Sequence, residues 1–228
     1  MIEYIHYLEQ VDTSIFLFFN GLHNSFWDSF MLLYSGRFVW VPLYVSFLYV
    51  MFKNYSWKSC LSCLLVITLL VTLCDQTASG LLKPMVGRFR PSNLDSPIAP
   101  LVHIVDNYRG GKYGFPSSHS ANSWGMTFFA MYLVRNKKLT SFLISWAVVM
   151  TYTRIYLGVH YPGDLLVGIL IGFIMATICY YGFEHFGKKY ADSFKSDDSR
   201  TIKFSSIPFI VGIGTVMVLL LISVIHLI

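Results

Sequence analysis

Long apolar stretches constrain this chain more than any other feature of its sequence. Several of them approach or reach the roughly twenty residues that span a bilayer as a helix. Of the 228 residues, 55% are hydrophobic and only 13% are charged, whereas a soluble domain carries about twice that charged fraction. We therefore expect an all-α polytopic membrane protein, a single bundle of six transmembrane helices. The predicted spans are residues 28–52, 60–82, 117–134, 139–157, 162–183 and 205–227.

The first 27 residues differ from these spans because acidic residues are interspersed with apolar ones. Glu3, Glu9 and Asp12 occur among aromatic and aliphatic side chains. This pattern predicts one interfacial helix or two short ones, with Asp12-Thr13-Ser14 as a helix cap. The segment contains no Lys or Arg, so it lacks the basic region of a secretory signal peptide.

Lysine and arginine are distributed unevenly among the connections. Ten of the 17 fall in connections that would share one side of the membrane, and such an excess marks the cytoplasmic side. We therefore expect a bacterial inner-membrane protein with both termini on the outer, periplasmic side. The net charge of +5 comes without a basic face interleaved with aromatic residues, so no nucleic-acid partner is expected. The cysteines lie in or beside apolar stretches, and we expect neither a disulfide nor a cysteine-bound metal.

Three polar clusters occur where apolar stretches begin or end. They read KPMVGRFRP over residues 83–91, GFPSSHS over 114–120 and TRIYLGVHYPGD over 153–164. The order of the spans places all three on the outer face. Together they supply cations, hydroxyls, two histidines and a carboxylate, which are the groups needed to bind a phosphoryl group and attack it with an imidazole.

The cations of these clusters are Lys83, Arg90 and Arg154. A single Lys or Arg at a helix end is usually explained by snorkelling to the membrane surface. Three of them on the same face as two histidines favour an anion site. Arginine can grip phosphate oxygens through two donors, and lysine acts as a point charge.

The histidines occur at two predicted helix starts. Ser117, Ser118 and His119 would open one helix, whose N–H groups form a natural anion site, with Ser117 also suited to N-capping. His160 and Asp164 are four residues apart, so they share a helical face. Asp164 can then accept from one ring nitrogen of His160 and leave the other as a nucleophile. A purely structural His–Asp pair is the alternative.

The three clusters together resemble the type-2 phosphatidic acid phosphatase superfamily, which is related to the vanadium haloperoxidases. The pattern of that family is K-x6-R-P, then P-S-G-H, then S-R-x5-H-x3-D. The first motif is intact here, from Lys83 to Pro91. The second has Ser118 in place of glycine, and the third has Thr153 in place of serine. The resemblance spans residues 28–185.

The resemblance implies roles for the matching residues. His160 would be the nucleophile that forms a phosphohistidine, Asp164 its orienting carboxylate and His119 the acid that protonates the leaving alkoxide. The phosphate would be bound by Lys83, Arg90, Ser117, the backbone N–H of Ser118 and Arg154. No metal or other cofactor is expected, because no Asp/Glu cluster with magnesium spacing occurs.

The implied activity is metal-independent hydrolysis of a membrane lipid phosphate. Four substrates remain open: undecaprenyl diphosphate, phosphatidylglycerol phosphate, phosphatidic acid and lipid A phosphates. A phosphotransferase with the same residues and an alcohol acceptor is one alternative. A non-catalytic lipid-phosphate binder or flippase is another, although it would leave His119, His160 and Asp164 without a task. The whole chain, 1–228, would form one domain, with an interfacial segment (1–27), a catalytic core (28–185) and an additional span (205–227).

Two further charged residues, Arg37 and Asp75, lie within predicted spans. Charges inside a membrane are costly and usually paired. At 1.5 Å per residue, both lie about 12–14 Å below the outer helix ends. We expect them to approach each other, directly or through a water or a polar side chain such as Gln76, and so to direct Lys83 towards the phosphate.

Overall fold

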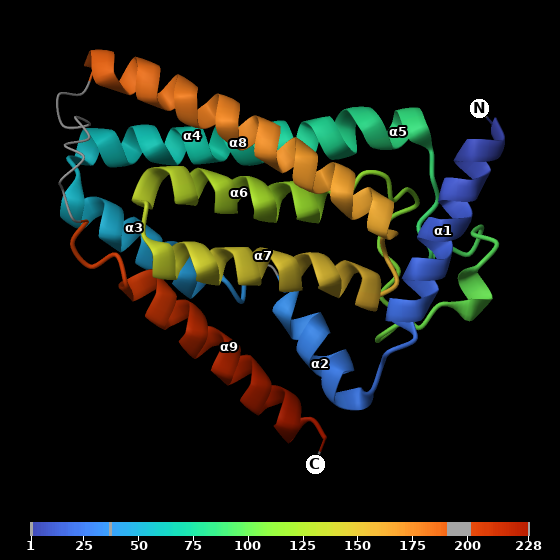
Figure 1. Cartoon of the computed structure of the whole chain (residues 1–228). Helices are drawn as coiled ribbons and strands as arrows, with labels where there is room; N and C mark the ends of the chain where they lie inside the picture. Colours follow the sequence, from blue (N-terminus) through green and yellow to red (C-terminus); the bar gives the residue numbers. More distant parts are fainter. Residues whose placement is uncertain (1, 37, 191–201, 228) are drawn as a thin grey trace.

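The computed structural model describes residues 2–36, 38–190 and 202–227, and within them the chain is all-helical (Figure 1). A π-helical segment, Gln76–Leu82, joins α4 to α5 without a break. A short 3-10 turn, Ala99–Leu101, lies in the loop between α5 and α6. The predicted all-α class is therefore confirmed. The α-helices are α1 (Ile2–Asn20), α2 (Ser25–Tyr34), α3 (Val41–Asn54), α4 (Trp57–Asp75), α5 (Lys83–Val86), α6 (Ser118–Val134), α7 (Lys137–Tyr156), α8 (Pro162–Tyr190) and α9 (Ile207–Ile225).

Three helices of the described chain are long and apolar enough to cross a membrane, namely Trp57–Val86, Pro162–Phe186 and Ile207–Ile225. They coincide with three of the six predicted spans. Helices α6 and α7 coincide with two more in position. However, α6 has only 17 residues, and α7 contains Arg154 and several hydroxyl side chains. Length and composition alone therefore do not identify α6 or α7 as a membrane-spanning helix.

The predicted span 28–52 is wrong as a single helix, because the chain breaks between α2 and α3. Gly36 lies in this break, and Pro42 stands in the first turn of α3, where its missing N–H leaves no helical bond unmade. The indole Nε1 of Trp40 donates to the Tyr34 carbonyl at 2.8 Å. It therefore satisfies a carbonyl that a continuous helix would have bonded itself. Gly36 and Pro42 predicted an irregular span, and the irregularity is a complete interruption.

The predicted cap at Asp12-Thr13-Ser14 is also wrong, because α1 continues through these residues without interruption. The capping residue is Asn24, whose side chain accepts from the Trp27 N–H at the start of α2 at 3.0 Å. Helix α1 lies across one end of the bundle, transverse to the long helices (Figure 1). Asp12 is consequently free to contact other elements.

The predicted approach of Arg37 to Asp75 lies outside the described residues, because Arg37 is not among them. Asp75 Oδ1 accepts from the hydroxyl of Ser79 at 3.4 Å, and Ser79 Oγ accepts from Lys83 Nζ at 3.1 Å. The π-helical segment thus carries a ladder of polar contacts that ends at Lys83. π-helical turns frequently occur at functional sites.

Helices α6 and α8 cross closely because glycines line their contact. A Cβ added to Gly172 would lie 2.6 Å from the carbonyl oxygen of Ala121, and one added to Gly168 would lie 2.5 Å from that of Ser117. Two small residues four apart allow this backbone approach, as in many pairs of membrane helices. The crossing brings the start of α6 against the start of α8, where the second and third polar clusters lie.

Candidate active site

The three polar clusters meet at one end of the bundle, so their predicted convergence is confirmed. Helices α5 and α7 end there, α6 and α8 begin there, and α1 lies across this end (Figure 1). Burial is deep, because Ser117, His160 and Asp164 are 0% exposed and Arg154 is 1% exposed. Polar groups buried to this degree need partners or a function.

The two ring nitrogens of His160 have different partners. Nδ1 lies 3.2 Å from Asp164 Oδ2, and Nε2 lies 3.2 Å from Arg90 Nη1. A guanidinium can only donate and an ionised carboxylate can only accept. The contacts therefore require the proton on Nδ1 and a lone pair on Nε2. The predicted pairing of His160 with Asp164 is confirmed, and Asp164 lies in the first turn of α8.

The electrostatic environment keeps the His160 ring neutral. Burial, followed by the charges of Arg90, Lys83 and Arg154, lowers the pKa of His160 well below its ordinary value of 6.5. The neutral ring, with its one N–H on Nδ1, therefore predominates at physiological pH, and Nε2 keeps the lone pair that accepts from Arg90.

Arg90 is held by backbone carbonyls. Its Nε donates to the Tyr113 carbonyl at 3.2 Å, and Nη1 donates to the Val159 carbonyl at 3.3 Å. Burial lowers the pKa of Arg90, but a guanidinium remains charged in proteins. Carbonyls orient this charge without neutralising it.

Arg154 is buried with an unused donor. Its Nε donates to Thr153 Oγ1 at 3.0 Å, and the Tyr108 side chain lies close to the same guanidinium. Arg154 Nη2 has no partner in the part of the chain that the structure describes. Leaving a buried charged donor unsatisfied is costly, so this group is prepared for an anion.

The start of α6 is fixed by Ser117, which is the predicted N-cap. Its Oγ accepts from the Ser120 N–H at 3.3 Å, and its own N–H donates to the Asp164 carbonyl at 3.0 Å. The Oγ of Ser118 accepts from Lys83 Nζ at 3.3 Å. Lys83 is thereby directed towards the N-terminus of α6, where free N–H groups and the helix dipole favour an anion.

His119 lies in the first turn of α6 and is half-buried. Its ring makes no hydrogen bond to the described residues, although the charges of Arg154, Arg90 and Lys83 all act on it. Among the residues in the three described ranges, no carboxylate pairs with Lys83, Arg90 or Arg154. The site therefore combines uncompensated positive charge with two histidines.

Three contributors to the site were missed at the sequence level. Arg88 Nη1 lies 2.9 Å from Asp164 Oδ1 and 2.8 Å from Asp12 Oδ2. Arg88 was visible inside the first cluster, but nothing in the sequence connected it to Asp12, 76 positions away. Gly114 is the third, because a Cβ there would lie 2.9 Å from Asp164 Oδ2. Its place at the start of the second cluster was the signal that the sequence offered.

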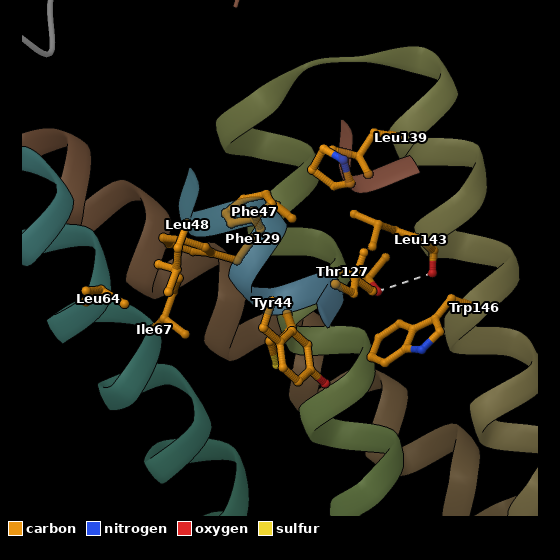
Figure 2. Close-up of a pocket in the computed structure, with 14 residues that line it drawn as sticks. Tyr44, Phe47, Leu48, Leu64, Ile67, Thr127, Phe129, Leu139, Leu143 and Trp146 are labelled. Carbon is orange, nitrogen blue, oxygen red and sulfur yellow. Dashed lines mark hydrogen bonds between the residues drawn. The ribbon is translucent and has the colours of Figure 1, made fainter. Parts of the chain in front are cut away.

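A separate apolar cavity of about 240 Å³ lies between α3, α4, α6 and α7, and Pro208 of α9 also lines it. Figure 2 shows its walls, including Leu64, Thr127 and Leu143, with the Thr127 hydroxyl donating to the Leu143 carbonyl at 3.4 Å. None of the predicted site residues lines it. It is therefore distinct from the site at the end of the bundle.

Comparison with known proteins defines the class. Residues 60–188, from the beginning of α4 to the end of α8, match the PAP2 superfamily. The chain is 48% identical over 177 residues to a lipid A 4'-phosphatase of Bacteroides thetaiotaomicron. The aligned region covers 78% of this chain and 79% of that protein. It is 36% identical over 176 residues to a lipid A 4'-phosphatase of Porphyromonas gingivalis, covering 77% and 74%.

A solved structure supports the fold. The crystal structure of Aquifex aeolicus LpxE matches with a TM-score of 0.56 and 22% identity, over 74% of this chain and 94% of that chain. The match over residues 60–188 and the 48% identical relative show that this chain belongs to the PAP2 superfamily, as its three motifs suggest. It is an integral membrane protein and a lipid phosphatase that hydrolyses phosphoric monoesters.

Proposed function

We propose that this phosphatase removes the 4'-phosphate of lipid A through a phosphohistidine at His160. The observation that carries the chemistry is the convergence of Lys83, Arg90 and Arg154, without carboxylate partners in the described chain, around an imidazole whose Nε2 carries a lone pair. The choice of lipid rests on the two relatives named lipid A 4'-phosphatases, whose lengths are covered to 79% and 74%.

In the first step, the Nε2 lone pair of His160 attacks phosphorus, and the bond from phosphorus to the sugar oxygen breaks. The proton on Nδ1 faces Asp164, whose carboxylate stabilises the positive charge that develops on the ring. The leaving alkoxide takes a proton from His119. The bound phosphate provides the negative charge that favours a protonated His119 among these cations.

In the second step, water attacks the phosphohistidine. His119, now neutral, accepts a proton from that water, and the bond between phosphorus and Nε2 breaks. Inorganic phosphate leaves, and His160 returns to the neutral tautomer with its proton on Nδ1. Both steps use the same two histidines in alternating roles.

The cations stabilise the transferring phosphoryl group in both steps. Arg154 Nη2 would donate to a phosphate oxygen, and Arg90 would exchange its contact with Nε2 for another. Lys83, the Ser117 hydroxyl and the Ser118 N–H would hold the remaining oxygens. This set of donors supplies charge stabilisation without a metal ion, and we propose a metal-independent reaction.

We further propose that six segments cross the inner membrane, with α2 and α3 together forming the first. The site and both termini would then face the periplasm. The Lys/Arg bias supports this orientation, since Lys53, Lys58, Lys137 and Lys138 occur at the α3–α4 and α6–α7 junctions. These junctions lie at the opposite end of the bundle from the site (Figure 1).

The test is phosphate release by the purified protein in detergent, with excess EDTA, from lipid A and from the other three lipid phosphates. Mass spectrometry of the lipid product identifies which phosphate is removed. We expect loss of the 4'-phosphate, persistence of activity in EDTA and inhibition by orthovanadate. The His160→Asn variant is the control for contaminating phosphatases.

Release from another lipid but not from lipid A would overturn the proposed substrate. Loss of activity in EDTA with recovery on adding magnesium would overturn the metal-free mechanism. Hydrolysis in ¹⁸O-labelled water should place one labelled oxygen in the released phosphate. Transfer of phosphate to an added alcohol in place of labelled release would indicate a phosphotransferase.

A further inference from the structure

One face of α1, formed by Asp12, Phe16 and Asn20, is buried against the rest of the protein. Asp12, Phe16 and Asn20 are spaced four apart and therefore lie along one face of the helix. Phe16 and Asn20 are 0% and 1% exposed, and the Asp12 side chain is 15% exposed. Neighbours on the other faces, such as Ile15 and Phe18, are exposed at 41% and 64%.

This face packs against residues 155–161, the segment that contains His160. The Asn20 side-chain amide donates to the carbonyls of Ile155 and Tyr156 at 3.1 and 2.9 Å. The Phe16 ring lies 5.4 Å from the ring of Tyr161. Helix α1 therefore contacts the chain both before and after His160.

Asp12 connects the face to the start of α8. Its Oδ1 accepts from the Gly163 N–H at 2.7 Å, where the helix dipole favours a negative charge. Its Oδ2 accepts from Arg88 Nη1 at 2.8 Å, and the same Nη1 donates to Asp164 Oδ1 at 2.9 Å. Both hydrogens of Nη1 are thus used, which fixes the guanidinium between two carboxylates.

Arg88 is suited to act as the counter-charge of Asp164. A fully buried carboxylate stays ionised only when it is paired and hydrogen-bonded. Burial alone would lower the pKa of Arg88, but the charge of Asp164 and the contact with Asp12 outweigh it and raise the pKa of Arg88. The guanidinium also stacks on Tyr161, with Cζ 3.9 Å from the ring centroid.

We propose that Asp12 of α1 is a positioning residue for the phosphatase reaction. By holding Arg88 against Asp164, it fixes the carboxylate that orients His160. This role rests on those assigned to His160 and Asp164 in the proposed function. The proposal adds a residue of α1 to those that support the reaction, and α1 lies outside the family match over residues 60–188.

The experiment compares Asp12→Asn, Arg88→Gln and the double variant as purified full-length proteins. Asn keeps an oxygen for the Gly163 N–H but removes the charge that holds Arg88. The matched control is Glu9→Gln, which removes a carboxylate from the same helix. The Glu9 side chain is 56% exposed, and its carboxylate lies 3.5 Å from His6 Nδ1.

We expect Asp12→Asn to lower kcat by about 10-fold and Arg88→Gln by about 10²-fold, the usual range for groups that orient a reacting residue. KM should change less than about twofold, because neither residue belongs to the phosphate-binding set. The double variant should match Arg88→Gln alone, since Asp12 acts through Arg88. Glu9→Gln should behave as wild type.

The pH profile of the reaction distinguishes a role in positioning Asp164 from a role only in packing α1 against the bundle. In Arg88→Gln, Asp164 loses its counter-charge and takes up a proton more readily. The acid limb of kcat/KM should therefore move to higher pH, and Arg88→Lys should return it towards its original position. A change in the stability of α1 packing alone would not move this limb.

Three outcomes would overturn the role of Asp12: wild-type kcat in Asp12→Asn, a rise in KM at unchanged kcat, or multiplicative losses in the double variant. If Asp12→Asn does not fold, Asp12→Ser replaces it, because serine also offers an oxygen to Gly163. An active His160→Asn would instead refute the proposed function. An inactive His160→Asn with a wild-type Asp12→Asn refutes only this inference.

Discussion

The candidate active site and the apolar cavity lie in the same bundle but differ in how closely their helices pack. Near the site, α6 and α8 approach until a Cβ on Gly172 would lie 2.6 Å from the carbonyl oxygen of Ala121. Around the cavity, about 240 Å³ remains among side chains such as Leu64, Ala130 and Leu143 (Figure 2). One region has no room for a methyl group, and the other has room for several.

The difference follows from the interactions that each region must hold. Hydrogen bonds weaken steeply with poor angles and distances, so the site requires a fixed backbone. Contacts between apolar side chains do not require a particular direction. In a membrane they also gain little over contacts with lipid, because lipid tails are as apolar as leucine. We therefore expect activity to depend on the tight region and to be insensitive to the loose one.

The largest effect is expected from His160→Asn, which removes the nucleophilic Nε2. Turnover should fall by at least about 10⁴-fold, as when a covalent nucleophile is lost. Acid-quenched reactions should no longer contain phosphohistidine. His6→Asn, at an exposed position on α1, is the control and should retain full activity. Substantial turnover by His160→Asn would remove this residue from the mechanism.

Arg154→Met should lower kcat/KM by about 10²–10³-fold, the usual loss for one donor to a developing oxyanion. Thermal stability should not fall, because the variant removes a buried charge whose Nη2 has no partner in the described chain. Activity and unfolding temperature are measured on the same preparation. A large loss of stability would show that Arg154 serves the fold rather than the anion.

His119→Ala should slow the reaction by about 10²-fold with a lipid alkoxide as leaving group, the scale for a lost general acid. The first step should be much less affected with an aryl phosphate such as p-nitrophenyl phosphate, since that leaving group needs no proton. Pre-steady-state release of p-nitrophenol measures this step. Equal losses in this step with both substrates would argue against His119 as the acid.

The smallest effects are expected from substitutions that enlarge one side chain in each of the two regions. Gly172→Ala should destabilise the protein by about 1–3 kcal/mol, the usual cost of overpacking, and lower kcat about 10-fold by separating α6 from α8. Ala130→Val adds two carbons at the cavity and should leave kcat within about twofold. Thermal unfolding and kcat of both variants test this contrast. A stronger effect at Ala130 would reverse the comparison.

Much of the site was readable from the sequence because its motifs are local. The four-residue spacing of His160 and Asp164 predicted their pairing through a shared helical face, and the pair forms although His160 lies just before α8, which begins at Pro162. Ser117 was recognisable as a helix cap from its place after Pro116. The apolar stretches placed α4 and α6 to α9 correctly, because their boundaries are marked by prolines and charged residues.

Only the tertiary structure decided the contacts between distant segments. The break between α2 and α3 depends on the Trp40 indole bonding the Tyr34 carbonyl, which no local pattern predicts. Asp12 was taken for a cap because its partners, Arg88 and Gly163, lie 76 and 151 positions away. A periodic pattern reports which face of a helix is buried, but not which element buries it. The sequence therefore indicated which polar groups form the candidate site, and only the tertiary structure revealed their contacts with α1.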